Sequence, residues 1–165
     1  MRNAHLRMTM NPSKKIENNI LIPEMASLLR EGKDVRFTPT GVSMRPFIEG
    51  GKDVVILRKL PDVKVGDISL AEVQKSAVTG PAPAKSYVLH RVIAIDGEQV
   101  TLLGDGNIGG TEQCTKADVL GTVIRIENAN GRRKPLTRGR LWYYLRPCRR
   151  ILLKVYRKLI KFGII

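Results

Sequence analysis

The segment Gly41-Val42-Ser43-Met44-Arg45-Pro46 places a serine in a turn bounded by glycine and proline. A second segment, Tyr87-Val88-Leu89-His90-Arg91-Val92-Ile93, carries a histidine 47 positions after that serine, and the chain has only one other, His5. A hydroxyl nucleophile needs a neighbouring base to take its proton, and imidazole can do so near neutral pH. The two segments therefore supply the minimum that a serine hydrolase needs, which is one serine in a turn and one imidazole.

Short strand-like stretches surround both segments. Alternating or continuous apolar residues predict strands at 35–38, 54–57, 65–71, 87–95, 99–103 and 120–126. Asp96-Gly97 separates two of them and is typical of a hairpin turn. Because no helical pattern intervenes between these strands, we expect a mainly β domain.

One helix is expected on each side of this domain. Residues 23–31 carry apolar side chains at helical spacing, with Pro23 suited to the first turn and Gly32 to the C-terminal cap. A second, amphipathic helix is expected from Pro147. The sequence thus predicts a disordered region at 1–17, a β domain at 18–127, and a basic linker with an amphipathic helix at 128–165.

The positive charge is concentrated in the last of these regions. The net charge is +14, and residues 128–165 hold twelve Lys and Arg and no acid. Trp142, Tyr143 and Tyr144 precede the helix, and such rings favour a membrane interface. The pattern over 141–165 is typical of a helix lying on an anionic membrane surface. A solvated face or a partner helix is an alternative, and a nucleic-acid patch is disfavoured because no recognition motif accompanies the charges.

The composition bears on disulfides, metal binding and membrane segments. Cys114 and Cys148 form neither a disulfide framework nor a metal-binding set, so we expect free thiols, no metal and no cofactor. The first residues are polar and basic, unlike a secretory signal peptide. No apolar run approaches the length of about 18 residues that is needed to span a bilayer.

Four sequence boxes in order resemble the signal peptidase I family, especially its serine–histidine branch of the endoplasmic-reticulum and archaeal type. They are the serine turn, Gly66-Asp67 before a strand, the His90-Arg91-Val92-Ile93 run, and Gly104-Asp105-Gly106-Asn107. The resemblance covers roughly residues 35–123. The wider superfamily also includes self-cleaving repressors that use a serine–lysine pair.

The resemblance implies a signal-peptidase-like β domain and a serine endopeptidase with Ser43 as nucleophile and His90 as general base. Asp105 is the favoured third residue, which would orient the imidazole. The family's second acidic position falls on Thr111, which is flanked by Glu112, so Glu112 is an alternative acid and a Ser–His dyad is another. The oxyanion would bind the N–H of Ser43; the hydroxyl that many relatives add falls on Gly41, with Thr40 adjacent.

The same resemblance implies a peptide or protein substrate, cut after a small residue in a leader or membrane-associated segment. Signal peptidases usually carry a spanning segment near the N-terminus, and this chain shows none. We therefore expect it at the periphery of a bacterial membrane, on the cytoplasmic face. The alternative function is a non-catalytic or self-cleaving regulatory protein that binds peptide or membrane.

Overall fold

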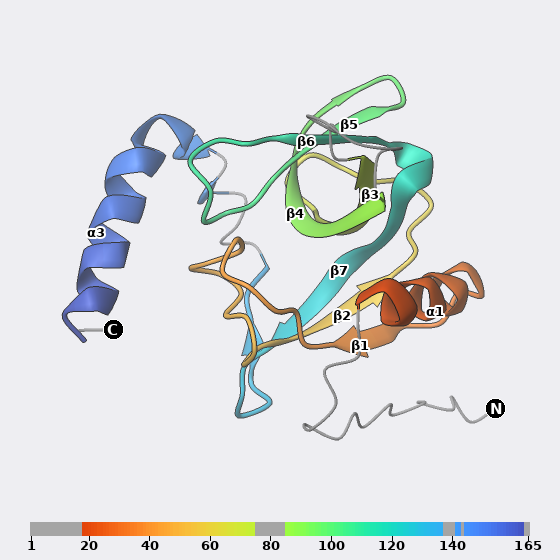
Figure 1. Ribbon diagram of the computed structural model, residues 1–165, viewed down its shortest axis with the longest axis horizontal. Helices are drawn as coiled ribbons and strands as arrows, with labels where there is room; N and C mark the ends of the chain where they lie inside the picture. Colours follow the sequence, from red (N-terminus) through yellow and green to blue (C-terminus); the bar gives the residue numbers. More distant parts are fainter. Residues whose placement is uncertain (1–17, 75–84, 137–140, 143, 164–165) are drawn as a thin grey trace.

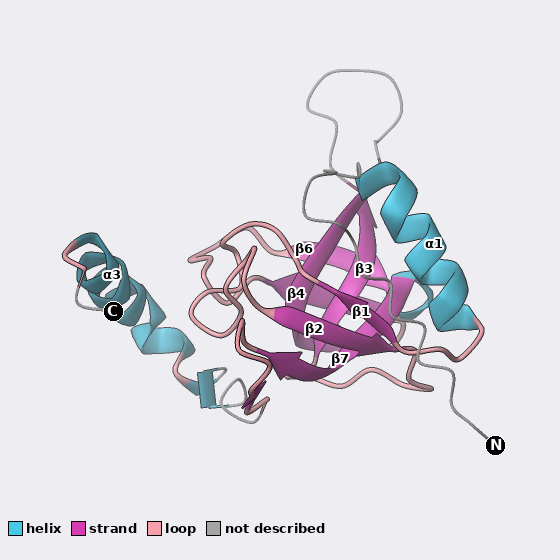
Figure 2. Ribbon diagram, turned by 90° about the horizontal axis from the view of Figure 1, so that it is seen from below, coloured by secondary structure: helices cyan, strands magenta, loops and turns pink. Residues whose placement is uncertain are grey.

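The computed structural model describes residues 18–74, 85–136, 141–142 and 144–163. The segment predicted to be disordered, 1–17, and Tyr143 of the aromatic cluster lie outside these residues. The described chain is mainly β with a helix before the sheet and a helix after it, which confirms the predicted fold class (Figure 2).

The strands form one curled antiparallel sheet that resembles half of a barrel (Figure 1). Its order is β1-β2-β7-β3-β4-β5-β6, and β8 pairs with β7 beside this path. The strands are β1 (Val35–Phe37), β2 (Val54–Arg58), β3 (Ile68–Gln74), β4 (Lys85–Asp96), β5 (Gln99–Leu103), β6 (Glu112–Thr115), β7 (Val119–Glu127) and β8 (Arg133–Lys134).

Two of these strands were not predicted from the sequence. In β6 the single apolar side chain is Cys114, and β8 contains only Arg133 and Lys134. β6 forms because it pairs with β5, from Gln99 opposite Thr115 to Leu102 opposite Glu112. Pairing with a neighbouring strand thus overrides a weak local preference.

Helix α1 (Asn18–Arg30) begins earlier than predicted and contains Pro23 in its interior. The prediction that Pro23 lies in the first turn was therefore wrong. Proline removes one backbone hydrogen bond from a helix. The helix nevertheless packs on the sheet because Ile22, Met25 and Leu29 on one face are buried. Gly32 ends it with a φ of 78°, as predicted for the cap.

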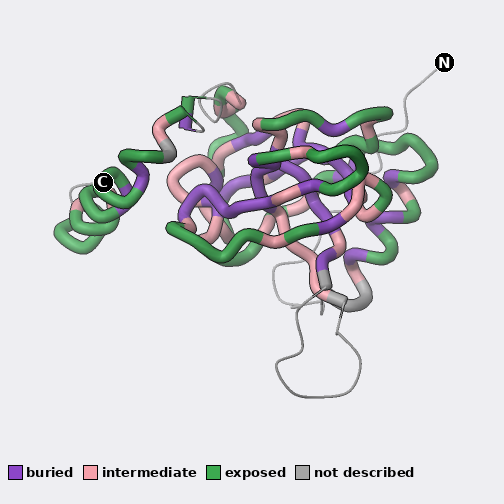
Figure 3. Tube along the Cα trace, turned by 90° about the horizontal axis from the view of Figure 1, so that it is seen from above, coloured by how far each residue is buried: buried purple, intermediate pink, exposed green. Residues whose placement is uncertain are grey.

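The core has two parts. Their residues are among the buried positions, which are purple in Figure 3. One part joins α1 to β1, β2, β3 and β7 and includes Met44 and Ile48 from the loop after β1. The other fills the curl between β3, β4, β5, β6 and β7. The first part therefore anchors the loop that carries Ser43.

A short 3-10 turn (Arg146–Cys148) leads into helix α3 (Arg149–Lys161), so the helix proper begins two residues after Pro147. It lies at the side of the sheet where the loops after β1 and β5 emerge (Figure 1). Within the described residues, no helix is both long and apolar enough to cross a membrane.

Both cysteines are free thiols. Cys114 is buried, and burial together with Asp118 raises the pKa of its thiol to about 11. Since the thiolate is the reactive form, Cys114 is an inert core residue. Cys148 is exposed at the start of α3.

Candidate active site

Ser43 lies in a tight turn, residues 41–48, which we call the serine turn. The N–H of Arg45 donates to the carbonyl of Val42 at 3.1 Å, and the N–H of Ile48 donates to that of Met44 at 3.0 Å. The side chains of Met44 and Ile48 are buried, while Ser43 is partly exposed. Gly41 has a φ of 97°, a conformation that only glycine adopts without strain. The buried side chains of Met44 and Ile48 thus hold the turn on the core, and Ser43 remains partly exposed.

His90 is placed by β4, opposite Ser69 on β3. β5 pairs with β4 only from Arg91 to Asp96. Among the described residues, the β4 segment from Lys85 to His90 is therefore paired along one edge and free along the other. His90 marks the point where the free edge ends.

A pocket of about 150 Å³ connects the serine turn to this free edge. Its wall includes Ser43 and His90, together with Pro39, Thr40, Gly41, Met44, Ile48, Gly50, Tyr87, Val88 and Leu89. The structure therefore brings together four of the residues singled out in the sequence: Thr40, Gly41, Ser43 and His90. Among the described residues, neither the Ser43 hydroxyl nor Nε2 of His90 has a hydrogen-bond partner.

The loop 104–107 packs against the back of the serine turn. The N–H of Gly106 donates to the carbonyl of Ser43 at 2.7 Å. A methyl group on Gly104 would lie 2.6 Å from that carbonyl oxygen and 3.0 Å from Nε2 of His90. Serine backbone and imidazole thus lie next to the same α-carbon. Position 104 requires glycine because no side chain fits between the carbonyl of Ser43 and the imidazole of His90.

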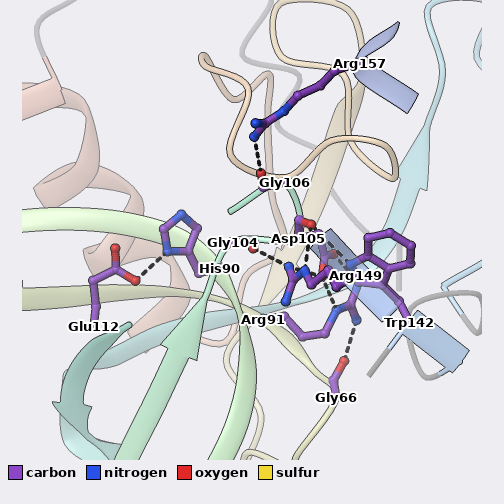
Figure 4. Close-up of polar contacts among 10 residues, drawn as sticks. All are labelled: Gly66, His90, Arg91, Gly104, Asp105, Gly106, Glu112, Trp142, Arg149 and Arg157. Carbon is purple, nitrogen blue, oxygen red and sulfur yellow. Dashed lines mark hydrogen bonds and ion pairs between the residues drawn. The ribbon is translucent and has the colours of Figure 1, made fainter. Parts of the chain in front are cut away.

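Glu112 supplies the acid next to the imidazole. Nδ1 of His90 and Oε2 of Glu112 are 2.9 Å apart (Figure 4). An ionised carboxylate can only accept a hydrogen bond, so Nδ1 carries the proton and Nε2 is left as the acceptor. Glu112 is the first residue of β6, which is why the strand that the sequence did not reveal matters to the site.

Asp105, the acid favoured from the sequence, pairs with a different residue. Its carboxylate accepts two hydrogen bonds from Arg91, at 2.8 Å from Nε and 2.6 Å from Nη2. Adjacent residues of a strand point to opposite faces, so Arg91 and His90 reach different partners. The expectation that Asp105 orients His90 is corrected: in this structure Glu112 bonds the imidazole, and Asp105 forms a buried ion pair.

The C-terminal region closes around this ion pair (Figure 4). Nε1 of Trp142 donates to the carbonyl of Asp105 at 3.1 Å, and Nε of Arg149 donates to the same oxygen at 3.2 Å. Arg91 lies over the ring of Phe47, Phe47 meets the edge of Trp142 with centroids 5.6 Å apart, and Arg149 lies over Trp142. These contacts fasten the C-terminal region to the serine turn and the loop 104–107.

Helix α3 reaches the same loops further along its length. Nη2 of Arg157 donates to the carbonyl of Gly106 at 3.0 Å, and the N–H of Gly106 in turn bonds the carbonyl of Ser43. Burial raises the pKa of the Tyr156 phenol, and the charge of Glu49, which pairs with Arg45 of the serine turn, adds to the rise. Helix α3 thus contacts the loop that packs against the serine turn.

Substitution of Gly104 by alanine is expected to destabilise the protein by about 1–3 kcal/mol, the usual range for overpacking. The added methyl group must displace the carbonyl of Ser43, which is backbone and cannot turn away. Chemical denaturation of both proteins measures the difference. Gly109→Ala is the matched control, because a methyl group there meets nothing within 4 Å. Equal stability of the two variants would contradict the packing described here.

The sequence missed Arg91, Trp142 and Arg149 as residues of this region. Arg91 directly follows His90, and that adjacency was the one available signal for a charged partner of Asp105. Trp142 is the chain's single tryptophan, but it was assigned to a membrane interface. Arg149 was counted among the free charges of the amphipathic helix, and its burial could not be foreseen from periodicity.

Comparison of the chain with protein-family models, with curated proteins and with solved structures found no match. The site is therefore interpreted from its own geometry and from the order of its sequence boxes.

Proposed function

We propose that this protein is a serine endopeptidase in which Ser43 is the nucleophile, His90 the general base and Glu112 the residue that orients the imidazole. The observation that carries the proposal is the pocket lined by both Ser43 and His90. The carboxylate of Glu112 lies 2.9 Å from Nδ1 of the imidazole, measured from its Oε2 atom. The order of the boxes that resemble signal peptidases supports it independently. Catalytic hydrogen bonds are often long before substrate binds, so the unpaired Ser43 hydroxyl fits such a site.

The first chemical step would form an acyl-enzyme. Oγ of Ser43 attacks the carbonyl carbon of the scissile peptide bond while its proton passes to Nε2 of His90. The negative charge that develops on the carbonyl oxygen requires donors, and the N–H of Ser43 faces no partner among the described residues. The carbon–nitrogen bond then breaks, and the leaving amine takes the proton from His90.

The second step would regenerate the serine. A water molecule gives its proton to Nε2 of His90 and attacks the ester carbon. The bond to Oγ breaks, the proton returns to Ser43, and the new carboxylic acid leaves. Glu112 stabilises the imidazolium that forms in both steps.

The substrate proposed is an extended peptide lying along β4. Among the described residues the edge of β4 from Lys85 to His90 is unpaired, and an extended peptide can add to such an edge through backbone hydrogen bonds. The pocket at its end is bounded by apolar side chains, including Met44, Tyr87 and Leu89. Its volume of about 150 Å³ favours a small apolar side chain next to the cleaved bond.

The direct test is covalent labelling of the serine. The full-length chain is incubated with a serine-directed acylating probe, and intact mass is followed with time. We expect a single adduct, its absence in Ser43→Ala, and labelling at least about 10³-fold slower in His90→Ala. Ser27→Ala, on the exposed face of α1, is the matched control and should label like the parent.

Two outcomes would overturn the proposal. One is no adduct on parent protein whose fold is intact by circular dichroism. The other is an adduct that persists in Ser43→Ala. Either result would favour the alternative of a non-catalytic domain that binds peptide at the β4 edge.

A further inference from the structure

Helix α3 has two faces with different surroundings. Leu153 and Arg149 are 1% and 6% exposed and face the β domain. Ile151, Val155 and Phe162 are 67%, 52% and 65% exposed. At 100° per residue these three fall within an arc of about 40°, on the side opposite Leu153. The helix therefore carries an apolar stripe that the described residues leave uncovered. In Figure 3 most positions of the helix have the colour of exposed residues.

Basic side chains border the stripe. Lys154, Lys158, Lys161 and Arg150 are exposed along one edge of it, and Leu152 and Leu159 flank the other edge. Arg149 and Arg157, by contrast, donate to backbone carbonyls of the loop 104–107. After Glu127 the chain has no acidic residue to neutralise the exposed charges. Two cations of the helix, Arg149 and Arg157, therefore bind the rest of the protein, whereas the others are exposed to the surroundings.

We propose that the outer face of α3 binds an anionic lipid bilayer, with Ile151, Val155 and Phe162 in the acyl-chain boundary and the lysines at the level of the phosphates. Charge complementarity identifies the partner: an exposed apolar stripe with cations and no acidic residue along its edge fits a surface that is apolar in its interior and negative at its headgroups. Long lysine side chains can reach the phosphates while their methylene groups lie on the apolar layer.

This arrangement fixes the β domain relative to the membrane. Because Arg149 and Arg157 bond carbonyls of the loop 104–107 and Leu153 is buried, the helix cannot turn independently of the serine turn. The pocket is then held at a set distance from the lipid surface. The binding surface shares no residue with the pocket, so the inference stands or fails separately from the proposed peptidase activity.

The test is sedimentation of the full-length protein with vesicles of equal parts phosphatidylcholine and phosphatidylglycerol, and with vesicles of phosphatidylcholine alone. We expect binding to the anionic vesicles only, weakened by added salt. Lys154→Gln with Lys158→Gln should reduce binding about 30-fold, at about fivefold for each charge. Ile151→Glu with Val155→Glu should reduce it at least about tenfold, because both remove apolar area and add negative charge.

Matched controls separate the helix from the overall charge. Lys52→Gln with Lys64→Gln removes the same charge from exposed positions of the β domain and should leave binding within about twofold. Equal loss in both lysine pairs would overturn the proposal, as would an absence of binding to anionic vesicles. A dimer that Val155→Glu dissociates would assign the stripe to a second copy of the chain instead. Circular dichroism on each variant verifies that the helix is retained.

Discussion

Replacement of Asp105 by alanine is expected to lower the free energy of unfolding by about 3–5 kcal/mol. Its side chain is 1% exposed and is held by two hydrogen bonds from Arg91, which is itself 3% exposed. Without the carboxylate, the guanidinium of Arg91 would remain buried without its counter-charge, and Arg149 would lose a charge at 3.9 Å. Loss of one member of a buried ion pair is far more costly than loss of an exposed pair.

The measurement is thermal and urea unfolding of the full-length variant. A loss of this size corresponds to a fall in Tm of about 6–20 °C for a chain of this length. Glu98→Ala is the matched control, since it removes an exposed carboxylate whose partner Lys116 is 3.8 Å away. That variant should unfold close to the parent.

Asp105→Asn keeps the shape of the side chain and replaces the alanine variant in the test if that variant does not fold. It should be less destabilised than Asp105→Ala, because the amide oxygen can still accept one hydrogen bond from Arg91. A variant as stable as the parent but slow in serine labelling would contradict the structural role and restore Asp105 as a residue of the reaction.

The second large effect concerns Glu112. Glu112→Gln is expected to slow acylation of Ser43 by about 10³- to 10⁴-fold, as expected when the acid of a serine triad becomes an amide. The glutamine amide can donate to Nδ1 of His90, which moves the imidazole proton to Nε2. Nε2 would then be a donor and could not take the proton of Ser43.

Labelling rates and unfolding curves of the same samples measure this effect. The free energy of unfolding should change little, because the Glu112 side chain is 27% exposed. Glutamine has the same shape as glutamate and can still form a hydrogen bond with His90. Glu98→Gln, in the exposed turn between β4 and β5, is the control for loss of one negative charge. Labelling of Glu112→Gln at the rate of the parent would show that the contact with His90 has no part in the activation of Ser43.

Asp105 and Glu112 thus illustrate what a motif can and cannot predict. The box Gly104-Asp105-Gly106-Asn107 lies in a loop beside the serine turn, since Gly106 bonds Ser43 and Gly104 lies against His90. The role first assigned to its aspartate depended on where the carboxylate points. That direction is set by Arg91 on the opposite face of β4, and no spacing in the sequence encodes it.

The helices show the same limit at the level of packing. Periodicity predicted the amphipathic C-terminal helix and which of its residues are basic. It treated those cations as equivalent, whereas Arg149 is buried on the carbonyl of Asp105 and Lys154 is exposed. The difference arises because the loop 104–107 presents carbonyl groups that need donors, and only the side chains turned toward that loop can supply them.

The sequence by itself determined the mainly β fold, the two flanking helices, and Ser43 and His90 as the candidate pair. These follow from local properties: apolar period, turn chemistry and residue type, each encoded within a few neighbouring positions. Only the tertiary structure decided that Glu112 lies at His90, that Asp105 is paired with Arg91, and that α3 is fastened to the loop 104–107. Those contacts join residues 14 to 51 positions apart, and the curl of the sheet that brings them together is a property of the whole chain.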